Sequence, residues 1–439
     1  MSDATANPTP TGPRRKALVV SGGPVGREMG GMAIRSVEFA RALASRMDVT
    51  LMAPEFDDTQ PVPEVEQLAY EAGSTRALER AVDEHDVVVT PSQPPGLTRH
   101  MQRADARLIV DLYAPEHFEA LERLADRPGR LNDYRSRLVL DRINGALAWA
   151  DVLLCGTERQ RDLWLGAMLS AGLIDLHTYQ RDPTYERVLP LVPSGVPAEP
   201  PARVEGASIR DRFPAIGRET EIVLWNGGVW SWLDPEVAIA AVEILIRRGR
   251  DVALVFMGVD PDASVRVTGM AEDKKLLNAG VYLNEGWLPY EDRATWLLDA
   301  DCAVSAHRLH LETRFSFRTR LLDCFWTGLP IVCTKGDVLS EMVEEEELGA
   351  AVPVQDPLAM ADSIDAVLRR GKDRYAGALG RAAERFAWSR VAEPLVEAAM
   401  AEEVPRDVRD APRIETDPGR AARWGADRVA RGVMGRLKR

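Results

Sequence analysis

Short runs of β-branched and other apolar residues alternate along this chain with longer stretches in which apolar residues recur at helical spacing. That alternation predicts βαβ units and therefore parallel sheets. In the first half the pattern predicts helices over residues 32–45 and 115–149, and strands at residues 16–21, 48–53, 87–90, 108–111 and 151–155. After a proline-rich segment it predicts a helix over residues 235–248 and further strands at residues 221–225, 252–257, 281–283, 302–305 and 331–334.

Length sets the number of domains, because 439 residues fit two α/β domains of about 200 residues each. We expect a disordered leader over residues 1–15, an N-terminal Rossmann-like domain over 16–197, a C-terminal Rossmann-like domain over 198–397 and a C-terminal segment over 398–439. The predicted fold class is α/β, with two Rossmann-like parallel-sheet domains facing across a cleft. Ligands of such sheets bind outside the carboxyl ends of the strands, so the cleft is the expected site.

Charge and cysteine content narrow the class of protein. The formal net charge of −13 argues against general nucleic-acid binding, which depends on Lys and Arg neutralising phosphates. The four cysteines have no CxxC spacing and predict buried thiols rather than a zinc site or a disulfide framework. No run of about 18 apolar residues is present, and the leader lacks the apolar core of a signal peptide. These features predict a cytoplasmic protein.

A glycine-rich turn follows the first strand of each predicted domain. Gly22 and Gly23, with Gly30 and Gly31, precede the first helix, and Gly227-Gly228 stands in the equivalent place of the second half. Glycine lets the backbone approach a ligand closely, and the next helix offers unpaired N–H groups to an anion. A tight turn without a ligand is the alternative for the first of these loops. Trp230 and Trp232 after the second turn either wall a pocket or serve as packing residues.

The segment from residue 307 to 330 contains the most specific motif. Arg314, Arg318 and Arg320 lie within seven residues, close to Glu312 and just after a predicted strand. The planar guanidinium group donates two hydrogen bonds at once, which suits it to phosphate. A solvated charged face is the default for an Arg-rich helix, but the interleaved Phe and Leu side chains make this element too apolar for it. The motif therefore predicts a phosphate-binding element.

These motifs resemble the retaining glycosyltransferases of family 4, which have the GT-B fold. The resemblance covers about residues 16–397 and rests on five pieces in order: the first glycine loop with RSVEFARALA, then ADVLLCGTERQR, VPSGVP, LLDCFWTGLPIV and FAWSRVAEPL. It implies transfer of a sugar from a nucleotide sugar of UDP or GDP type to a glycan or small-molecule acceptor, as in polysaccharide biosynthesis. It also implies retention of configuration without a metal or other cofactor.

The resemblance also assigns roles on the donor side. The family places two glutamates eight positions apart, and alignment on LLD gives the second place, at the ribose, to Asp323 and the first to Phe315. Glu312 is the nearest carboxylate to that first place and the candidate catalytic residue. Gly228 and Asp234 stand where the family has an Arg/Lys pair, so we expect the diphosphate to be bound by Arg318 and Arg320 with Gly227 and Gly228 instead. Glu285, Gly286 and Trp287 fall where the family binds the base.

On the acceptor side the resemblance is weaker. Asp111 closes a strand where many members carry a catalytic or sugar-contacting His, so it is a second catalytic candidate. Tyr113 and His117 follow it and complete an acceptor-side cluster with the first glycine loop. His117 is alternatively a surface residue at the start of a helix.

Other functions stay open on the sequence. A sugar-nucleotide epimerase on the same double fold would act on the donor alone, and a non-catalytic GT-B scaffold would bind no nucleotide. A nicotinamide dehydrogenase is a weaker alternative, because the first loop lacks the GxGxxG spacing.

The last segment is basic. Residues 420–439 contain seven basic residues and one acidic residue, with an apolar side when drawn as a helix. They form either an amphipathic helix on the inner face of a membrane, which would suit a lipid-linked acceptor, or a disordered tail.

Overall fold

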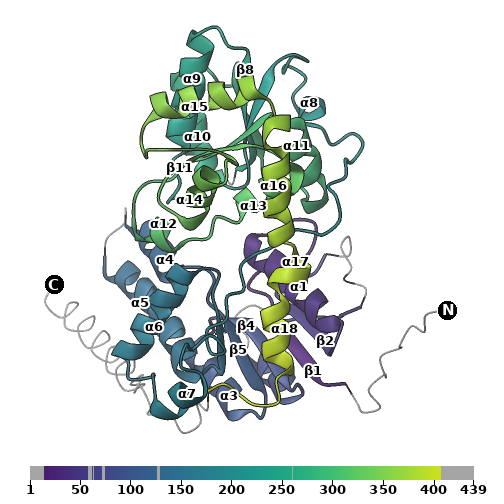
Figure 1. The fold of residues 1–439 in the computed structure, drawn as a ribbon, viewed down its shortest axis with the longest axis vertical. Coiled ribbons are helices and arrows are strands. Elements are labelled where there is room, and N and C mark those ends of the chain that lie inside the picture. Colours follow the sequence, from purple (N-terminus) through teal and green to yellow (C-terminus); the bar gives the residue numbers. More distant parts are fainter. Residues whose placement is uncertain are drawn as a thin grey trace, which may run out of the picture.

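The structure is a computed structural model that describes residues 14–57, 62, 64–71, 75–125, 129–259 and 261–406, with the side chains of 261–264 left out. Figure 1 shows two stacked lobes, the N-terminal one in purple and blue and the other in green. The predicted basic segment 420–439 and most of the predicted leader lie outside the described residues. Among the residues described, no helix is both long and apolar enough to cross a bilayer.

A parallel six-stranded sheet of order β3-β2-β1-β4-β5-β6 forms the centre of the first lobe. This is the order of a Rossmann fold. Its strands are β1 (Lys16–Val20), β2 (Asp48–Ala53), β3 (Glu66–Ala69), β4 (Val87–Pro91), β5 (Arg107–Asp111) and β6 (Val152–Leu154). Its helices are α1 (Gly31–Ala44), α2 (Arg76–Asp83), α3 (Pro95–Arg103), α4 (Glu116–Leu124), α5 (Arg130–Trp149), α6 (Glu158–Ser170) and α7 (Leu176–Arg181). The single helical stretch expected over 115–149 is thus two helices.

The second lobe repeats this topology, with the strand order β12-β11-β10-β7-β8-β9. Its strands are β7 (Glu221–Trp225), β8 (Val252–Val259), β9 (Val281–Glu285), β10 (Cys302–Ser305), β11 (Ile331–Thr334) and β12 (Gly349–Val352). Its helices are α8 (Ile209–Arg212), α9 (Pro235–Arg247), α10 (Pro261–Asp273), the 3-10 turn η1 (Tyr290–Asp292), α11 (Arg293–Asp299), α12 (Leu311–Phe315), α13 (Arg320–Thr327), α14 (Val338–Glu345), α15 (Pro357–Arg370) and α16 (Asp373–Arg385). The prediction of two Rossmann-like domains is confirmed.

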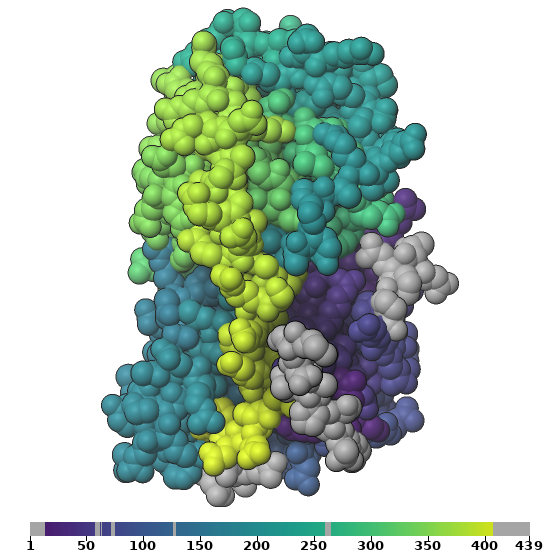
Figure 2. All heavy atoms as spheres, turned by 45° about the vertical axis from the view of Figure 1, so that its right-hand side comes forward, coloured from purple at the N-terminus to yellow at the C-terminus, as the bar shows by residue number. Residues whose placement is uncertain are grey.

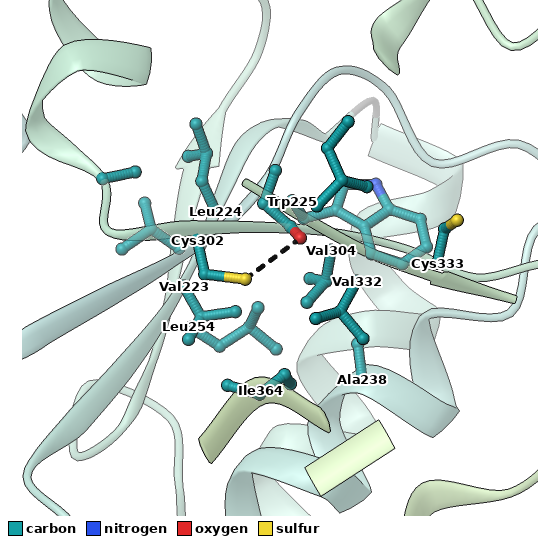
Figure 3. Packing of buried hydrophobic residues seen from close by; sticks show 14 of the residues in the cluster. Val223, Leu224, Trp225, Ala238, Leu254, Cys302, Val304, Val332, Cys333 and Ile364 are labelled. Carbon is teal, nitrogen blue, oxygen red and sulfur yellow. Dashed lines mark hydrogen bonds between the residues drawn. The ribbon is translucent and has the colours of Figure 1, made fainter. Parts of the chain in front are cut away.

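The inner strands of the second sheet, β7, β8, β10 and β11, are buried on both faces, which explains their continuous apolar runs. Figure 3 shows Val223, Leu254 and Cys302 from three neighbouring strands beside Ile364 of α15. The Cys302 thiol donates a weak hydrogen bond to the Ala303 carbonyl oxygen at 3.4 Å. All four cysteines are buried and free, as the sequence predicts.

The chain returns to the first lobe at its C-terminal end. Helices α17 (Trp388–Val391) and α18 (Glu393–Met400) lie against the first sheet and α1, and Trp388 meets Phe39 edge to face at 6.2 Å. Figure 2 shows this yellow segment running from the second lobe down over the first. Gly195 lies at the crossing, where a Cβ atom would stand 2.8 Å from the Phe386 carbonyl oxygen. Residues 388–397, expected in the second domain, therefore pack on the first.

Loops at the carboxyl ends of both sheets meet each other. The Tyr290 amide after β9 donates to the Arg27 carbonyl after β1 at 2.8 Å, and Gln160 after β6 donates to the Phe315 carbonyl after β10 at 2.7 Å. Arg159 and Glu341 form an ion pair across the same junction at 2.6 Å. The two sheets thus present their ligand-binding ends to one another.

Candidate functional site

The glycine turn of the second domain joins β7 to α9. Gly227 has φ +100°, a left-handed conformation that favours glycine. Asn226 holds the turn against α13 by donating from Nδ2 to the Arg320 carbonyl oxygen at 2.6 Å. Arg320 in turn donates from Nη2 to the Gly228 carbonyl oxygen at 3.0 Å. Two of the predicted phosphate-binding features, the glycine turn and Arg320, are therefore in direct contact.

Arg320 is a cation without a carboxylate partner among the described residues. Its Nη1 atom is buried and makes no hydrogen bond there. Burial, and then the neighbouring Arg318, lower the pKa of Arg320 to about 9, so the group is still charged at neutral pH. A buried donor left without a partner costs free energy, which an anion placed at the glycine turn would recover.

Arg318, unlike Arg320, is paired with a carboxylate, that of Glu312. Arg318 donates from Nη1 and Nη2 to the two carboxylate oxygens of Glu312 at 2.8 and 2.7 Å, and both side chains are buried. The Nε atom of Arg318 lies 3.8 Å from Asp337. The sequence assigned Arg318 to the diphosphate and Glu312 to catalysis, whereas the structure shows the two groups satisfying each other. They form a buried ion pair that supports the segment from which α13 begins.

Asp337 and His307 complete this buried network, and sequence analysis gave neither of them a role. Asp337 caps α14 by accepting from the Ser340 amide at 2.8 Å, and burial raises its pKa to about 6. An Asp between a strand and a helix is an N-cap signal that could have identified it. His307 shares a hydrogen bond of 2.7 Å between Nδ1 and the Thr334 hydroxyl. Burial and the nearby Arg318 lower the pKa of His307 to about 2, so its imidazole is neutral.

The residues predicted at the ribose and base lie along the same edge. Asp323 on α13 is 3.6 Å from the Arg293 guanidinium, which stacks at 3.6 Å on the ring of Tyr290. Burial raises the pKa of the Asp323 carboxyl. Glu285 is exposed at the end of β9, and Gly286 has φ +81°. Asp323 thus already has a cationic neighbour at the place predicted for the ribose.

Three tryptophans form a row next to the glycine turn. Trp230 stacks on Trp232 with ring centroids 5.8 Å apart and lies 5.9 Å from Trp287. A Cβ atom on Gly228 would stand 3.0 Å from Cη2 of Trp287, so glycine permits this approach. Trp230 and Trp287 each keep 38% of their surface exposed. The row can therefore both pack and present a ring face to a ligand.

Asp111 in the first domain is also engaged in an ion pair. Both of its carboxylate oxygens accept from Arg35, at 2.6 and 2.9 Å. Arg35 donates further to the Val192 carbonyl at 2.6 Å and lies between the rings of Phe39 and Tyr113, at 4.4 and 4.5 Å. Sequence analysis missed Arg35, and its only signal was a charge on an otherwise apolar helix face. Asp111 was predicted as catalytic, and here it fixes α1 to the sheet.

The remaining acceptor-side residues surround the start of α1. A Cβ atom on Gly31 would stand 3.4 Å from the Tyr113 hydroxyl and 3.8 Å from the Thr319 hydroxyl of the second domain. Positions 23 and 30 have open space around them, whereas position 22 borders Met32 and Pro91. His117 is half-buried at the start of α4, and its Nδ1 atom has no partner within the described structure. Tyr113 and Gly31 are thus the members of this cluster that reach the junction.

Across the described ranges, no group of three or more His, Cys, Asp or Glu side chains is arranged to hold a metal ion.

Comparison with known proteins gives one family match. Residues 220–370 match the family model described as glycosyl transferases group 1. A D-inositol 3-phosphate glycosyltransferase of Xylanimonas cellulosilytica is 25% identical over 433 residues, which cover 89% of this chain and 97% of that protein. A phosphatidyl-myo-inositol mannosyltransferase of Mycobacterium leprae is 32% identical over 83 residues, covering 18% of this chain and 22% of that protein.

Solved structures share the fold at low identity. WaaG, a glycosyltransferase involved in lipopolysaccharide biosynthesis, superposes with a TM-score of 0.63 at 14% identity and covers 88% of this chain and 100% of its own. HepE of Anabaena, in complex with UDP-glucose, gives a TM-score of 0.64 at 12% identity, covering 87% and 98%. The fold is GT-B, as the sequence predicts. The family model covers most of the second domain, and the D-inositol 3-phosphate glycosyltransferase extends the similarity to glycosyltransferases over 89% of the chain.

Proposed function

We propose that this protein transfers a sugar from a nucleotide-sugar donor to a glycan or small-molecule acceptor, with retention of configuration. The donor binds at the carboxyl end of the second sheet, and the acceptor enters from the first. Support for a UDP-type donor comes from HepE, whose structure holds UDP-glucose. The two curated relatives act on inositol-containing acceptors by name, which supports a polyhydroxylated acceptor.

One observation carries the proposal: the guanidinium of Arg320 lies against the Gly227-Gly228 turn with a buried N–H group that no described residue accepts. A diphosphate at this turn would accept that N–H together with backbone amides of the turn. Because Arg318 is already bound to Glu312, we assign the diphosphate contact to Arg320 and give Arg318 a positioning role.

The same arrangement accounts for catalysis. As the bond between the sugar carbon and the phosphate oxygen breaks, negative charge grows on the departing diphosphate. A fixed cation in a poorly solvated site stabilises that charge without having to reorganise. The protein side chains supply this charge, so the proposed reaction needs no metal ion.

The base and ribose would lie farther along the same edge. Trp287 offers a half-exposed ring next to Gly228, and Asp323 offers a carboxylate one helical turn beyond Arg320. On the other side, Tyr113 and Gly31 border the space from which the acceptor would approach.

A thermal-shift panel of UDP, GDP, ADP and dTDP sugars tests the proposal. We expect one nucleotide series to raise the melting temperature of the wild type, and Arg320→Ala to abolish most of that shift. Arg314→Ala is the matched control, because Arg314 lies in the same segment with an exposed side chain. If no nucleotide sugar shifts the melting temperature of either protein, the proposal is wrong. Incubating the stabilising donor alone, without acceptor, then checks that it is not epimerised.

A further inference from the structure

One face of helix α4 lies against the second domain. Phe118 stacks on Phe315 with ring centroids 5.6 Å apart and an interplanar angle of 22°. Glu122 lies 4.0 Å from Nε2 of His310, and the Arg123 guanidinium lies 5.7 Å from the ring of Trp232. Phe118 and Glu122 are four positions apart and Arg123 follows Glu122, so the three contacts lie on the side of the helix that faces the second domain.

Glu119 belongs to that side as well, since it stands three and four positions before Glu122 and Arg123. It is half-buried, and it makes no hydrogen bond or ion pair within the described part of the chain. The other acidic residues near the junction are engaged: Asp111 with Arg35, Glu116 with Ser92 and Arg142, Glu312 with Arg318, and Asp323 with Arg293. Within the described residues, Glu119 is thus a half-buried carboxylate at this junction with free hydrogen-bonding capacity.

The charged groups around Glu119 come from both domains. Glu312 and Arg318 face it from the second domain, and Glu116 and Arg123 from its own helix. Burial, reinforced by the charge of Glu312, raises the pKa of Glu119 to about 7. A half-buried carboxylate of this kind gains from any hydroxyl group that donates to it, because such bonds favour the charged form.

The buried pair Glu312–Arg318 also influences Arg320. Arg320, which we assign to the diphosphate, and Glu119 are therefore both neighbours of the same ion pair. A sugar attached to a diphosphate at Arg320 would reach the space next to that pair. A carboxylate facing this space can accept hydrogen bonds from two sugar hydroxyls.

We propose that Glu119 binds hydroxyl groups of the transferred sugar, so that the first domain selects the sugar while the second domain holds the nucleotide. This inference rests on the proposed function and adds a residue of sugar specificity to it. Glu119 contacts the sugar in the donor complex and leaves the nucleotide untouched. The protein should therefore bind a nucleotide sugar more tightly than the nucleoside diphosphate of that sugar.

Calorimetric titration of the full chain with UDP and UDP-glucose tests the inference. If the thermal-shift panel favours another nucleotide sugar, that sugar and its own nucleoside diphosphate take their place. At pH 8 we expect the wild type to bind the nucleotide sugar roughly 10-fold more tightly than the diphosphate, as one or two charge-assisted hydrogen bonds provide. Glu119→Gln should lose most of that difference while its affinity for the diphosphate stays unchanged. Glu122→Gln, on the same helix face but next to His310, is the matched control and should keep the difference.

The pH dependence gives a second readout. In the wild type the affinity difference should shrink as the pH falls from 8 to 6, because Glu119 becomes protonated, and in Glu119→Gln it should be flat. The inference is overturned if Glu119→Gln keeps the affinity difference between the two ligands, or if it loses affinity equally for both. Neither result would contradict the proposed donor site. If neither ligand binds the wild type, the proposed function itself fails.

Discussion

The two domains have the same strand order and opposite unsatisfied charges. Among the residues that the structure describes, none serves as a counterion to the Arg320 cation at the glycine turn of the second domain, and none donates a hydrogen bond to the Glu119 carboxylate on α4 of the first. Each domain also contains a buried bidentate Arg–carboxylate pair, Arg35–Asp111 or Arg318–Glu312. The difference teaches that the paired charges hold each domain together, whereas the unpaired ones are those to which we assign the substrate.

The largest expected effect on stability comes from breaking one of these buried ion pairs. Arg318→Ala leaves Glu312 buried without its partner, which should lower the free energy of unfolding by about 3–5 kcal/mol. Urea denaturation measures this loss. The double variant Arg318→Met/Glu312→Leu removes both charges and should recover most of it. A loss below about 1 kcal/mol in Arg318→Ala would mean that the pair does not hold the domain together.

Removing the Glu119 carboxylate should instead raise the free energy of unfolding. The pKa of Glu119 is raised from 4.5 to about 7, so the folded state binds its proton more tightly than the unfolded state does. Wild-type stability therefore falls as the pH rises through this window. Glu119→Gln removes the effect and should gain about 1–2 kcal/mol over the wild type between pH 5 and pH 8, after allowance for partial exposure. Thermal unfolding at both pH values measures this gain, and an equal stability difference at the two would contradict it.

The smallest effect on stability is expected from removing an exposed ion pair between the two domains. Arg159 and Glu341 pair across the junction with side chains 31% and 53% exposed. Such pairs contribute about 0–1 kcal/mol and are screened by salt. Arg159→Ala should therefore change the urea midpoint little, and not at all in high salt. A large loss would mean that the junction depends on this pair.

Local pattern was sufficient to predict most of the fold. The apolar runs of the core strands identified both sheets, because strands buried on both faces need apolar residues throughout. Edge strands β3 and β12 were missed because EQLA is half polar and mostly exposed, and GAAV has small, half-exposed side chains. The return of α17 and α18 to the first lobe was also missed, since no local signal says which sheet an amphipathic helix will cover.

The site was only partly predictable, for a related reason. The glycine turn and the Arg-rich segment are local signals, and the structure brings Gly228 and Arg320 into contact. The partner of Asp111 is Arg35, 76 positions away, and no spacing rule connects them. Arg318 and Arg320 have the same local sequence context, yet one precedes α13 and turns to Glu312 while the other begins the helix and turns to the glycine turn.

The most direct test compares UDP with uridine as ligands of the wild type, Arg320→Ala and Arg320→Lys. If Arg320 binds the diphosphate, Arg320→Ala should weaken UDP binding by about 10- to 100-fold and leave uridine binding unchanged, since a charge-assisted hydrogen bond contributes about 1.5–3 kcal/mol. Arg320→Lys should fall between the two, because lysine keeps the charge and loses the planar fork. Equal UDP affinity in the wild type and Arg320→Ala, or an equal loss for UDP and uridine, would contradict the account.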